Sequence, residues 1–241
     1  MNIQIVSDIH LDYDDINESD FKDIIKPSAE ILIIAGDLGN PFNDNYYNFL
    51  KFYSILFVKI FIISGNHEYY YNNMFETDIK IQKICSKFNN IYFLNNKSYE
   101  YNEILFIGST LWSNIPNTLE KYHLSTINDY RNIKEFTHYK SNQLFRENVD
   151  FIQNQLKKNK KSLIITHHAP SFQCIPDEFK TDILNICFYS NLEYLFDNAN
   201  IIGWIYGHTH NNCNITINNS FIRSNCYRSK DYNDNLIISI I

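Results

Sequence analysis

The sequence predicts an α/β protein in which helices cover a sheet of largely parallel strands. Short apolar runs rich in β-branched residues alternate with longer amphipathic segments along most of the chain, and this alternation is typical of parallel sheets. Three further strand-like runs near the carboxyl terminus look antiparallel and suggest a second sheet stacked on the first. Because the strand-like runs are apolar on both sides, we expect both faces of the sheets to be covered.

The predicted strands are short, and most of them end at a glycine or a polar residue. Glu30–Ala35 has the sequence EILIIA and stops at Gly36, which favours a buried strand over a helix. The full set of predicted strands is Asn2–Ser7, Glu30–Ala35, Val58–Ile63, Ile91–Phe93, Ile104–Ile107, Ser162–Thr166, Ile201–Tyr206, Cys213–Ile217, Phe221–Ser224 and Leu236–Ile240.

Amphipathic segments between these strands predict helices. In Asn43–Phe57 the large apolar residues recur at helical spacing, as expected for a helix that packs one face on a sheet. Phe21–Lys26 is a shorter candidate that Pro27 stops. The other predicted helices are Met74–Phe88, His138–Lys158 and Asn191–Phe196.

The composition predicts a single domain over residues 1–241, because no linker-like segment or repeat divides the chain. A net charge of -6 argues against a protein that binds nucleic acid without sequence preference, because such proteins usually carry a basic face. The five cysteines are an odd number without a CxxC pair, which favours reduced thiols inside a cell. The sequence shows neither a signal peptide nor a membrane-spanning apolar stretch, so we expect a soluble, cytoplasmic protein.

Polar residues follow five of the predicted strands, and six of the eight histidines lie in these five clusters. In open α/β sheets, ligands bind at the carboxyl ends of the strands. Burying so many polar side chains without a bound ion would be costly. The clusters are Asp8-x-His10, Gly36-Asp37-x-Gly39-Asn40, Gly65-Asn66-His67-Glu68, His167-His168 and Gly207-His208-Thr209-His210.

These residue types predict a site for divalent metals. Imidazole nitrogens together with carboxylate or amide oxygens bind Mn, Fe, Zn or Ni. Asp8 and His10 are two residues apart, so they point to the same side of an extended segment. A carboxylate such as Asp37 can bridge two ions through its two oxygens. The glycines Gly36, Gly65 and Gly207 are expected to let the chain turn as it leaves each strand.

Taken in order, the five motifs resemble those of the calcineurin-like metallophosphoesterase superfamily, and they extend from Asp8 to His210. The resemblance implies a four-layer α/β/β/α sandwich with two stacked mixed sheets. It also implies two divalent metal ions bridged by Asp37. The implied ligands are Asp8, His10 and His210 for one ion, and Asn66, His167 and His208 for the other.

The same resemblance implies hydrolysis of a phosphomonoester or phosphodiester by attack of a metal-bridging hydroxide. His67, Asp37 and Asn66 are the expected catalytic residues. In this interpretation His67 faces the substrate and either protonates the leaving group or stabilises the charged transition state. Asn40 is expected to hydrogen-bond near the metals or the phosphate. Glu68 is expected to be structural, with orientation of His67 as one such role.

The resemblance leaves three residues without a firm role. His168 is expected to support the site, because His167 comes first after its strand. Trp112 in the segment Gly108–Trp112 either packs or touches substrate. Arg228 lies in a late segment, SNCYRS, that lacks the glycine of the similar "SN...RGY" segment.

A small phosphate-ester substrate is the favoured interpretation, but alternatives stay open. A nuclease is disfavoured by the acidic net charge. A protein phosphatase could use the long segment Asn114–Thr137 as a recognition loop. A non-catalytic scaffold for a protein partner is disfavoured because Asp37, Asn66 and His67 are all present. The substrate, the native metals and the oligomeric state stay open.

Overall fold

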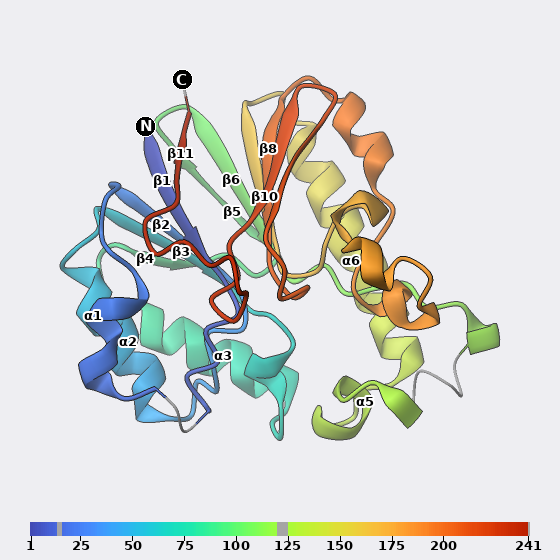
Figure 1. The fold of residues 1–241 in the computed structure, drawn as a ribbon, viewed down its shortest axis with the longest axis horizontal. Helices are drawn as coiled ribbons and strands as arrows, with labels where there is room; N and C mark the ends of the chain where they lie inside the picture. The colour runs from blue at the N-terminus through green and yellow to red at the C-terminus, as the bar shows by residue number, and fades with distance from the viewer. Residues whose placement is uncertain (14–15, 120–124, 241) are drawn as a thin grey trace.

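The computed structural model describes residues 1–13, 16–119 and 125–240. Two sheets lie face to face in the middle of the molecule, and helices cover their outer faces (Figure 1). The predicted α/β sandwich with two mixed sheets is therefore confirmed.

The first sheet has the strand order β11-β1-β2-β3-β4. Its central strands run parallel to one another, and β11 pairs antiparallel with β1 at one edge. The strands are β1 (Asn2–Val6), β2 (Ile31–Ala35), β3 (Lys59–Ile63), β4 (Ile91–Phe93) and β11 (Ile237–Ser239).

The second sheet has the order β5-β6-β7-β8-β10-β9. Strands β6, β7, β8 and β10 are parallel, and the edge strands β5 and β9 are antiparallel to their neighbours. The strands are β5 (Lys97–Tyr101), β6 (Ile104–Ser109), β7 (Ser162–Thr166), β8 (Ile201–Tyr206), β9 (Cys213–Ile217) and β10 (Ser220–Ser224).

The helices lie on the outer faces of the two sheets. Helices α1, α2 and α3 cover the first sheet and α6 covers the second (Figure 1). The α-helices are α1 (Phe21–Ile24), α2 (Asp44–Ser54), α3 (Met74–Cys85), α5 (Asp129–Asn132) and α6 (His138–Leu156). Short 3₁₀ helices are η1 (Glu18–Asp20), η2 (His67–Tyr69), η3 (Asn117–Leu119), η4 (Phe172–Cys174), η5 (Asp177–Phe179), η6 (Ile183–Cys187) and η7 (Glu193–Asp197).

Alternate residues along each central strand enter different hydrophobic cores. In β2, Ile31 and Ile33 pack between the two sheets, whereas Leu32 and Ile34 pack against α2 and its neighbours. All four side chains are fully buried. Since successive side chains of a strand point to opposite faces, a strand that is apolar throughout belongs in a sheet covered on both sides. The continuous apolar runs are therefore explained by the four layers.

The structure differs from the predicted elements in three places. Strand β5 was not predicted, because its sequence KSYEY is polar and lies at an exposed edge. Asn191–Phe196 forms only the 3₁₀ helix η7. The carboxyl-terminal strands do not form a sheet of their own: β9 and β10 extend the second sheet, and β11 returns to the first. Strand pairing between distant segments is not encoded in the local pattern that suggested an antiparallel tail.

The carboxyl ends of the parallel strands from both sheets meet at one edge of the sandwich. The loop after β8 hydrogen-bonds to the loop after β7, since the Gly207 N–H donates to the His167 carbonyl at 3.0 Å. It also contacts the other sheet, where the His208 N–H donates to the Asp8 carboxylate at 3.0 Å. Loops that belong to different sheets are thus brought together in space. No helix in the described ranges is long and apolar enough to cross a membrane.

Candidate metal centre

The loops after β1 and β2 run side by side and fix the first motif residues. The Asp8 N–H donates to the Gly36 carbonyl at 3.1 Å, and the His10 N–H donates to the Asp37 carbonyl at 3.0 Å. These hydrogen bonds extend the pairing of the two strands beyond their ends. Asp8 and His10 are fully buried and Asp37 is nearly so, so the side chains are held in position by a hydrogen-bonded backbone.

Several candidate ligands have a left-handed backbone conformation that non-glycine residues adopt rarely. Such conformations cost of order 1–3 kcal/mol each and cluster at functional sites, where the surrounding structure enforces them. The residues and their φ angles are Asp8 (56°), His10 (54°), Asp37 (53°), His208 (68°) and His210 (49°). The concentration of strain in these residues indicates that their side-chain directions matter more than local stability.

Three glycines beside the site were predicted to let the chain turn, and only Gly36 has the positive φ of such a turn. Gly36 has φ 85° and does serve a turn. Gly65 has no such backbone; a Cβ there would lie 2.2 Å from Asp37 Oδ1 and 2.7 Å from His167 Nε2. A Cβ at Gly207 would lie 2.8 Å from Asp8 Oδ2. Gly65 and Gly207 therefore allow the candidate ligands to approach the backbone closely.

Asp8, His10 and His210 form a first group of candidate ligands, with ligand atoms within 4.8 Å of one another. His210 Nε2 lies 3.4 Å from Asp8 Oδ1 and 3.2 Å from His10 Nε2. Two imidazole nitrogens and a carboxylate oxygen converge on one point. This convergence is the arrangement that a transition-metal ion requires.

Asp37, His167 and His208 form a second group of the same kind. His167 Nε2 lies 3.2 Å from Asp37 Oδ2 and 3.1 Å from Asn66 Oδ1. The other ring nitrogen, Nδ1, lies 2.9 Å from the Ala35 carbonyl. With the Nδ1 proton donated to that carbonyl, Nε2 is the ring nitrogen that faces the group, and it can bind a cation when the cation displaces its proton. Asn66, His167 and His208 are thus brought together as the sequence predicts.

The carboxylate of Asp37 lies between the two groups. Its Oδ2 is 3.8 Å from His10 Nε2 in the first group and 3.2 Å from His167 Nε2 in the second. Its Oδ1 accepts the backbone N–H of His67 at 2.9 Å. A single oxygen therefore faces both groups, whereas the sequence suggested that each carboxylate oxygen would face one ion.

The electrostatics of the site favour bound positive charge. Burial alone would raise the pKa of the Asp37 carboxyl, but the imidazoles of His167 and His67 hold it well below its ordinary value. Burial opposes protonation of His167, but the charge of Asp37 raises the pKa of that ring to about 10. In His10 the penalty of burial prevails and lowers the pKa to about 4.

The carboxylates of Asp8 and Asp37 are buried, and in the described residues their ion-pair partners are imidazoles. Divalent cations fit this set of donors, because they would neutralise the two carboxylates.

The amino-terminal part of the chain, residues 1–212, matches the sequence profile of the calcineurin-like phosphoesterases. The chain belongs to this family. An uncharacterized protein of Acanthamoeba polyphaga mimivirus is 36% identical over 254 residues, covering 92% of this chain and 89% of the relative.

Two solved structures share the fold. A phosphopantetheinyl hydrolase from Mycobacterium tuberculosis superposes with a TM-score of 0.72 at 14% identity, covering 93% of this chain and 88% of that one. A dimetal phosphatase from Danio rerio superposes with a TM-score of 0.58 at 12% identity, covering 92% of this chain and 86% of that one. The family is metal-dependent, and the clustered ligand groups of this chain agree with that dependence.

Glu68 has a structural role, as predicted, but it acts on the loop backbone and not on the His67 ring. Its carboxylate accepts the backbone N–H groups of Asp37, Leu38 and Gly65 at 3.0, 2.7 and 2.7 Å. Glu68 is completely buried, and this burial together with the charge of Asp37 raises its pKa to about 8. The side chain therefore fastens the loops after β2 and β3 to each other and does not orient the His67 ring.

His67 is held by neighbouring rings. It stacks on Tyr70 with centroids 4.2 Å apart and meets His10 edge-on at 4.4 Å. With His10 and Asp37 it also forms a third group whose ligand atoms lie within 4.8 Å. The ring lines the cleft described below, so it is placed both beside the first cation group and where a substrate would enter.

Sequence reasoning missed Asp129 and Tyr70, which support Asn66. The Asn66 Nδ2 group donates to Asp129 Oδ1 at 2.8 Å, and the Tyr70 hydroxyl donates to the same oxygen at 2.8 Å. This pairing turns Asn66 Oδ1 toward His167. Asp129 begins the short helix α5, far from any strand-end motif, so no sequence signal connected it with the site.

The remaining predicted residues lie around the centre. His168 is buried beside His208 with ring centroids 4.2 Å apart, and burial with the charge of His167 lowers its pKa to about 3. Trp112 packs on Phe136 in the core and does not occur among the described residues that line the cleft. Asn40 Oδ1 accepts the Phe42 N–H at 3.0 Å in a turn, and Asn40 does not occur among the described residues that line the cleft.

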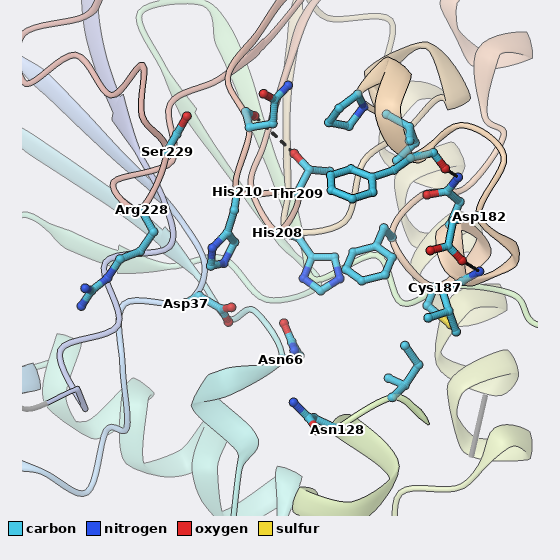
Figure 2. Close-up of a pocket in the computed structure, with 18 of the residues that line it drawn as sticks. Asp37, Asn66, Asn128, Asp182, Cys187, His208, Thr209, His210, Arg228 and Ser229 are labelled. Atoms are coloured by element: carbon cyan, nitrogen blue, oxygen red, sulfur yellow. Dashed lines mark hydrogen bonds between the residues drawn. The ribbon is translucent and has the colours of Figure 1, made fainter. Parts of the chain in front are cut away.

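A cleft of about 770 Å³ opens onto the second group. Asp37, Asn66 and His208 line its middle part, and Arg228 lies to one side of them (Figure 2). The Arg228 side chain donates to the Ile9 carbonyl at 3.3 Å and lies over the Tyr13 ring with its guanidinium carbon 5.0 Å from the centroid. The cleft also reaches residues 126–129, which belong to the predicted recognition segment; residues 120–124 of that segment lie outside the described residues.

Proposed function

We propose that the protein is a two-metal hydrolase of small phosphomonoesters or phosphodiesters. The observation that supports this most strongly is the position of Asp37 Oδ2, which lies within 3.8 Å of a ring nitrogen in each of the two ligand groups. Asp8, His10 and His210 would hold one divalent ion; Asn66, His167 and His208 would hold the other. The donor set suits Mn, Fe, Zn or Ni.

When bound, two such cations would supply positive charge to the phosphoryl oxygens and lower the pKa of a water between them. The protein's own residues would do the rest. His67 lines the cleft beside Asp37 and is the candidate to give a proton to the departing oxygen. Arg228 is anchored to a backbone carbonyl near the same end of the cleft, and its guanidinium suits a phosphoryl oxygen.

A small substrate is favoured over a nucleic acid. The net charge is -6, and the outer part of the cleft carries the carboxylates of Glu178 and Asp182. Acidic groups beside the entrance would repel a polyanion. A cleft of this volume is in the range of small-molecule sites.

The test is turnover of bis-p-nitrophenyl phosphate and p-nitrophenyl phosphate by metal-free protein that is reloaded with Mn²⁺. We expect turnover only after reloading. Asp37→Ala should remove activity together with bound metal, because Asp37 is shared by both groups. Exposed Asp177→Ala, which lies outside the site, is the matched control and should keep both. Absence of turnover with any divalent metal, or full activity of Asp37→Ala, would contradict the proposal.

A further inference from the structure

The cleft has two chemically different halves. Figure 2 shows Arg228 and Ser229 on one side of Asp37 and His208, and Asp182 and Cys187 on the other. On the Arg228 side the lining residues are polar or charged: Arg228 and Lys230 are basic, and Asp231 is acidic. On the opposite side the lining residues include the apolar side chains of Ile127, Ile175, Phe179, Leu184 and Phe188.

The apolar half forms a wall made mainly by the segment 175–188. Phe188 stacks on His208 with centroids 4.8 Å apart and an interplanar angle of 25°. The wall therefore begins directly beside a candidate ligand of the second cation. A group attached to a phosphate at the metal centre would meet this surface first.

Several hydrogen bonds hold the wall in place. The Ala169 N–H donates to the Phe188 carbonyl at 3.1 Å, and the Ser190 N–H donates to the Ala169 carbonyl at 2.9 Å. Further out, Asp182 accepts the Leu184 N–H at 2.8 Å, and the Asn185 side chain donates to the Phe179 carbonyl. The surface is thus formed before a ligand arrives, which lowers the entropy cost of binding.

Apolar side chains of this wall remain partly exposed to the cleft. Phe179 is 50% exposed, and Leu184 is partly exposed. The acidic residues Glu178 and Asp182 line the cleft beside them. An apolar surface rimmed by carboxylates favours an uncharged apolar group and disfavours a second anionic group.

We propose that the substrate is a phosphate ester whose organic part is uncharged and apolar, aromatic or branched, and binds against Phe179, Leu184 and Phe188. This inference rests on the proposed function, from which it takes the position of the phosphate at the metal centre. What it adds is the chemical class of the leaving group. The segment 175–188 determines specificity, and the Arg228 side of the cleft binds the phosphate.

Two alkyl monoesters test the inference, since their leaving alcohols differ in polarity while both are poor leaving groups. Mn²⁺-loaded protein should turn over 2-phenylethyl phosphate with a kcat/KM about tenfold or more above that for glycerol 3-phosphate. Leu184→Ser should lower kcat/KM for 2-phenylethyl phosphate about fivefold to tenfold more than kcat/KM for glycerol 3-phosphate. Ile183→Ser is the matched control, because Ile183 is exposed and does not line the cleft in the described residues. Equal kcat/KM values for the two esters, or equal effects of the two serine variants, would overturn the inference.

A binding measurement tests the apolar wall independently of the proposed hydrolysis. Calorimetry of the Mn²⁺-loaded protein compares 2-phenylethylphosphonate with methylphosphonate, neither of which has an ester bond to hydrolyse. Tighter binding of the phenylethyl compound, weakened by Leu184→Ser, supports the apolar wall even if no ester is turned over. Equal affinities overturn the wall even if both esters are hydrolysed. Glu178→Gln should strengthen binding of a para-carboxylated phenylethylphosphonate, and an unchanged affinity would contradict the role given to the acidic rim.

Discussion

The two groups of candidate ligands differ in how firmly the protein holds them. In the first group the His210 side chain is 44% exposed, whereas Asp8 and His10 are fully buried. In the second group His167 is completely buried, with Nδ1 against the Ala35 carbonyl. Asn66 in the second group is also held, by Asp129.

With a cation in each group, as proposed, this difference would make one cation more tightly held than the other. Ligands that are oriented by their own hydrogen bonds bind metal more tightly, because less order has to be imposed on binding. We therefore expect the second group to retain its cation longer on dilution or chelation. If the two groups bind their cations independently, a change that affects one group should leave cation binding in the other unchanged.

The largest expected effect is a decrease in kcat when His67 is replaced. This variant distinguishes a role in catalysis from a role in binding metal. His67→Ala should lower kcat by about 10²- to 10⁴-fold, because a proton donor to the leaving group is lost, while both cations are retained. The loss should be greater for phenyl phosphate than for p-nitrophenyl phosphate. The measurement is steady-state kinetics together with metal content by mass spectrometry.

Tyr71→Ala provides the control, since Tyr71 lies close in the sequence and its side chain is 68% exposed. It should leave both kcat and metal content unchanged. If His67→Ala loses a cation, His67 is a ligand of the third group formed with His10 and Asp37, and the catalytic role is wrong.

An intermediate effect is expected at Asp129, which hydrogen-bonds directly to Asn66 of the second group. Asp129→Ala removes the acceptor that orients Asn66, so the affinity for one cation should fall by about 10- to 100-fold. The affinity for the other cation should not change. Mn²⁺ titration calorimetry resolves the two affinities.

Asp129→Asn is the matched variant, because its side-chain oxygen can still accept the Asn66 Nδ2 group. It should restore most of the lost affinity. An equal decrease for both cations in Asp129→Ala would show that Asp129 acts through the fold and not through Asn66.

The smallest expected effect is a pH dependence of cation affinity in the second group. The pKa of His167 is raised to about 10 in the metal-free protein, so this ring keeps its proton at neutral pH. A cation must displace that proton, and its affinity should therefore rise with pH by up to about tenfold per unit. Calorimetry in buffers of different ionisation enthalpy measures the released proton.

Asp129→Ala keeps His167 and should show the same pH slope at a lower affinity. An affinity that does not change between about pH 6 and about pH 8 would contradict the proton displacement.

The motif residues of the site could be predicted from the sequence, because parallel strands bring their carboxyl ends to one edge. Asp8, His67 and His210 are far apart in the chain, yet each follows a strand or its short turn. Their chemistry is visible in the residue types, and their proximity follows from the sheet.

The supporting residues could not be predicted in the same way. Asp129 and Asn66 are 63 positions apart, and neither local periodicity nor a motif links them. Glu68 was visible as part of a motif, but its three backbone donors come from two loops whose packing is a tertiary property. The apolar wall at 175–188 consists of 3₁₀ turns without regular spacing, so the sequence pattern gave no signal for it.

The central claim is that one oxygen of Asp37 lies between two cations. Electron paramagnetic resonance of the Mn²⁺-loaded protein tests it directly, because two Mn²⁺ ions that share a carboxylate oxygen are magnetically coupled. We expect the spectrum of a coupled pair in the unaltered protein and its loss in Asp37→Ala. A spectrum of isolated Mn²⁺ ions at full loading, or a coupled pair that persists in Asp37→Ala, would contradict it.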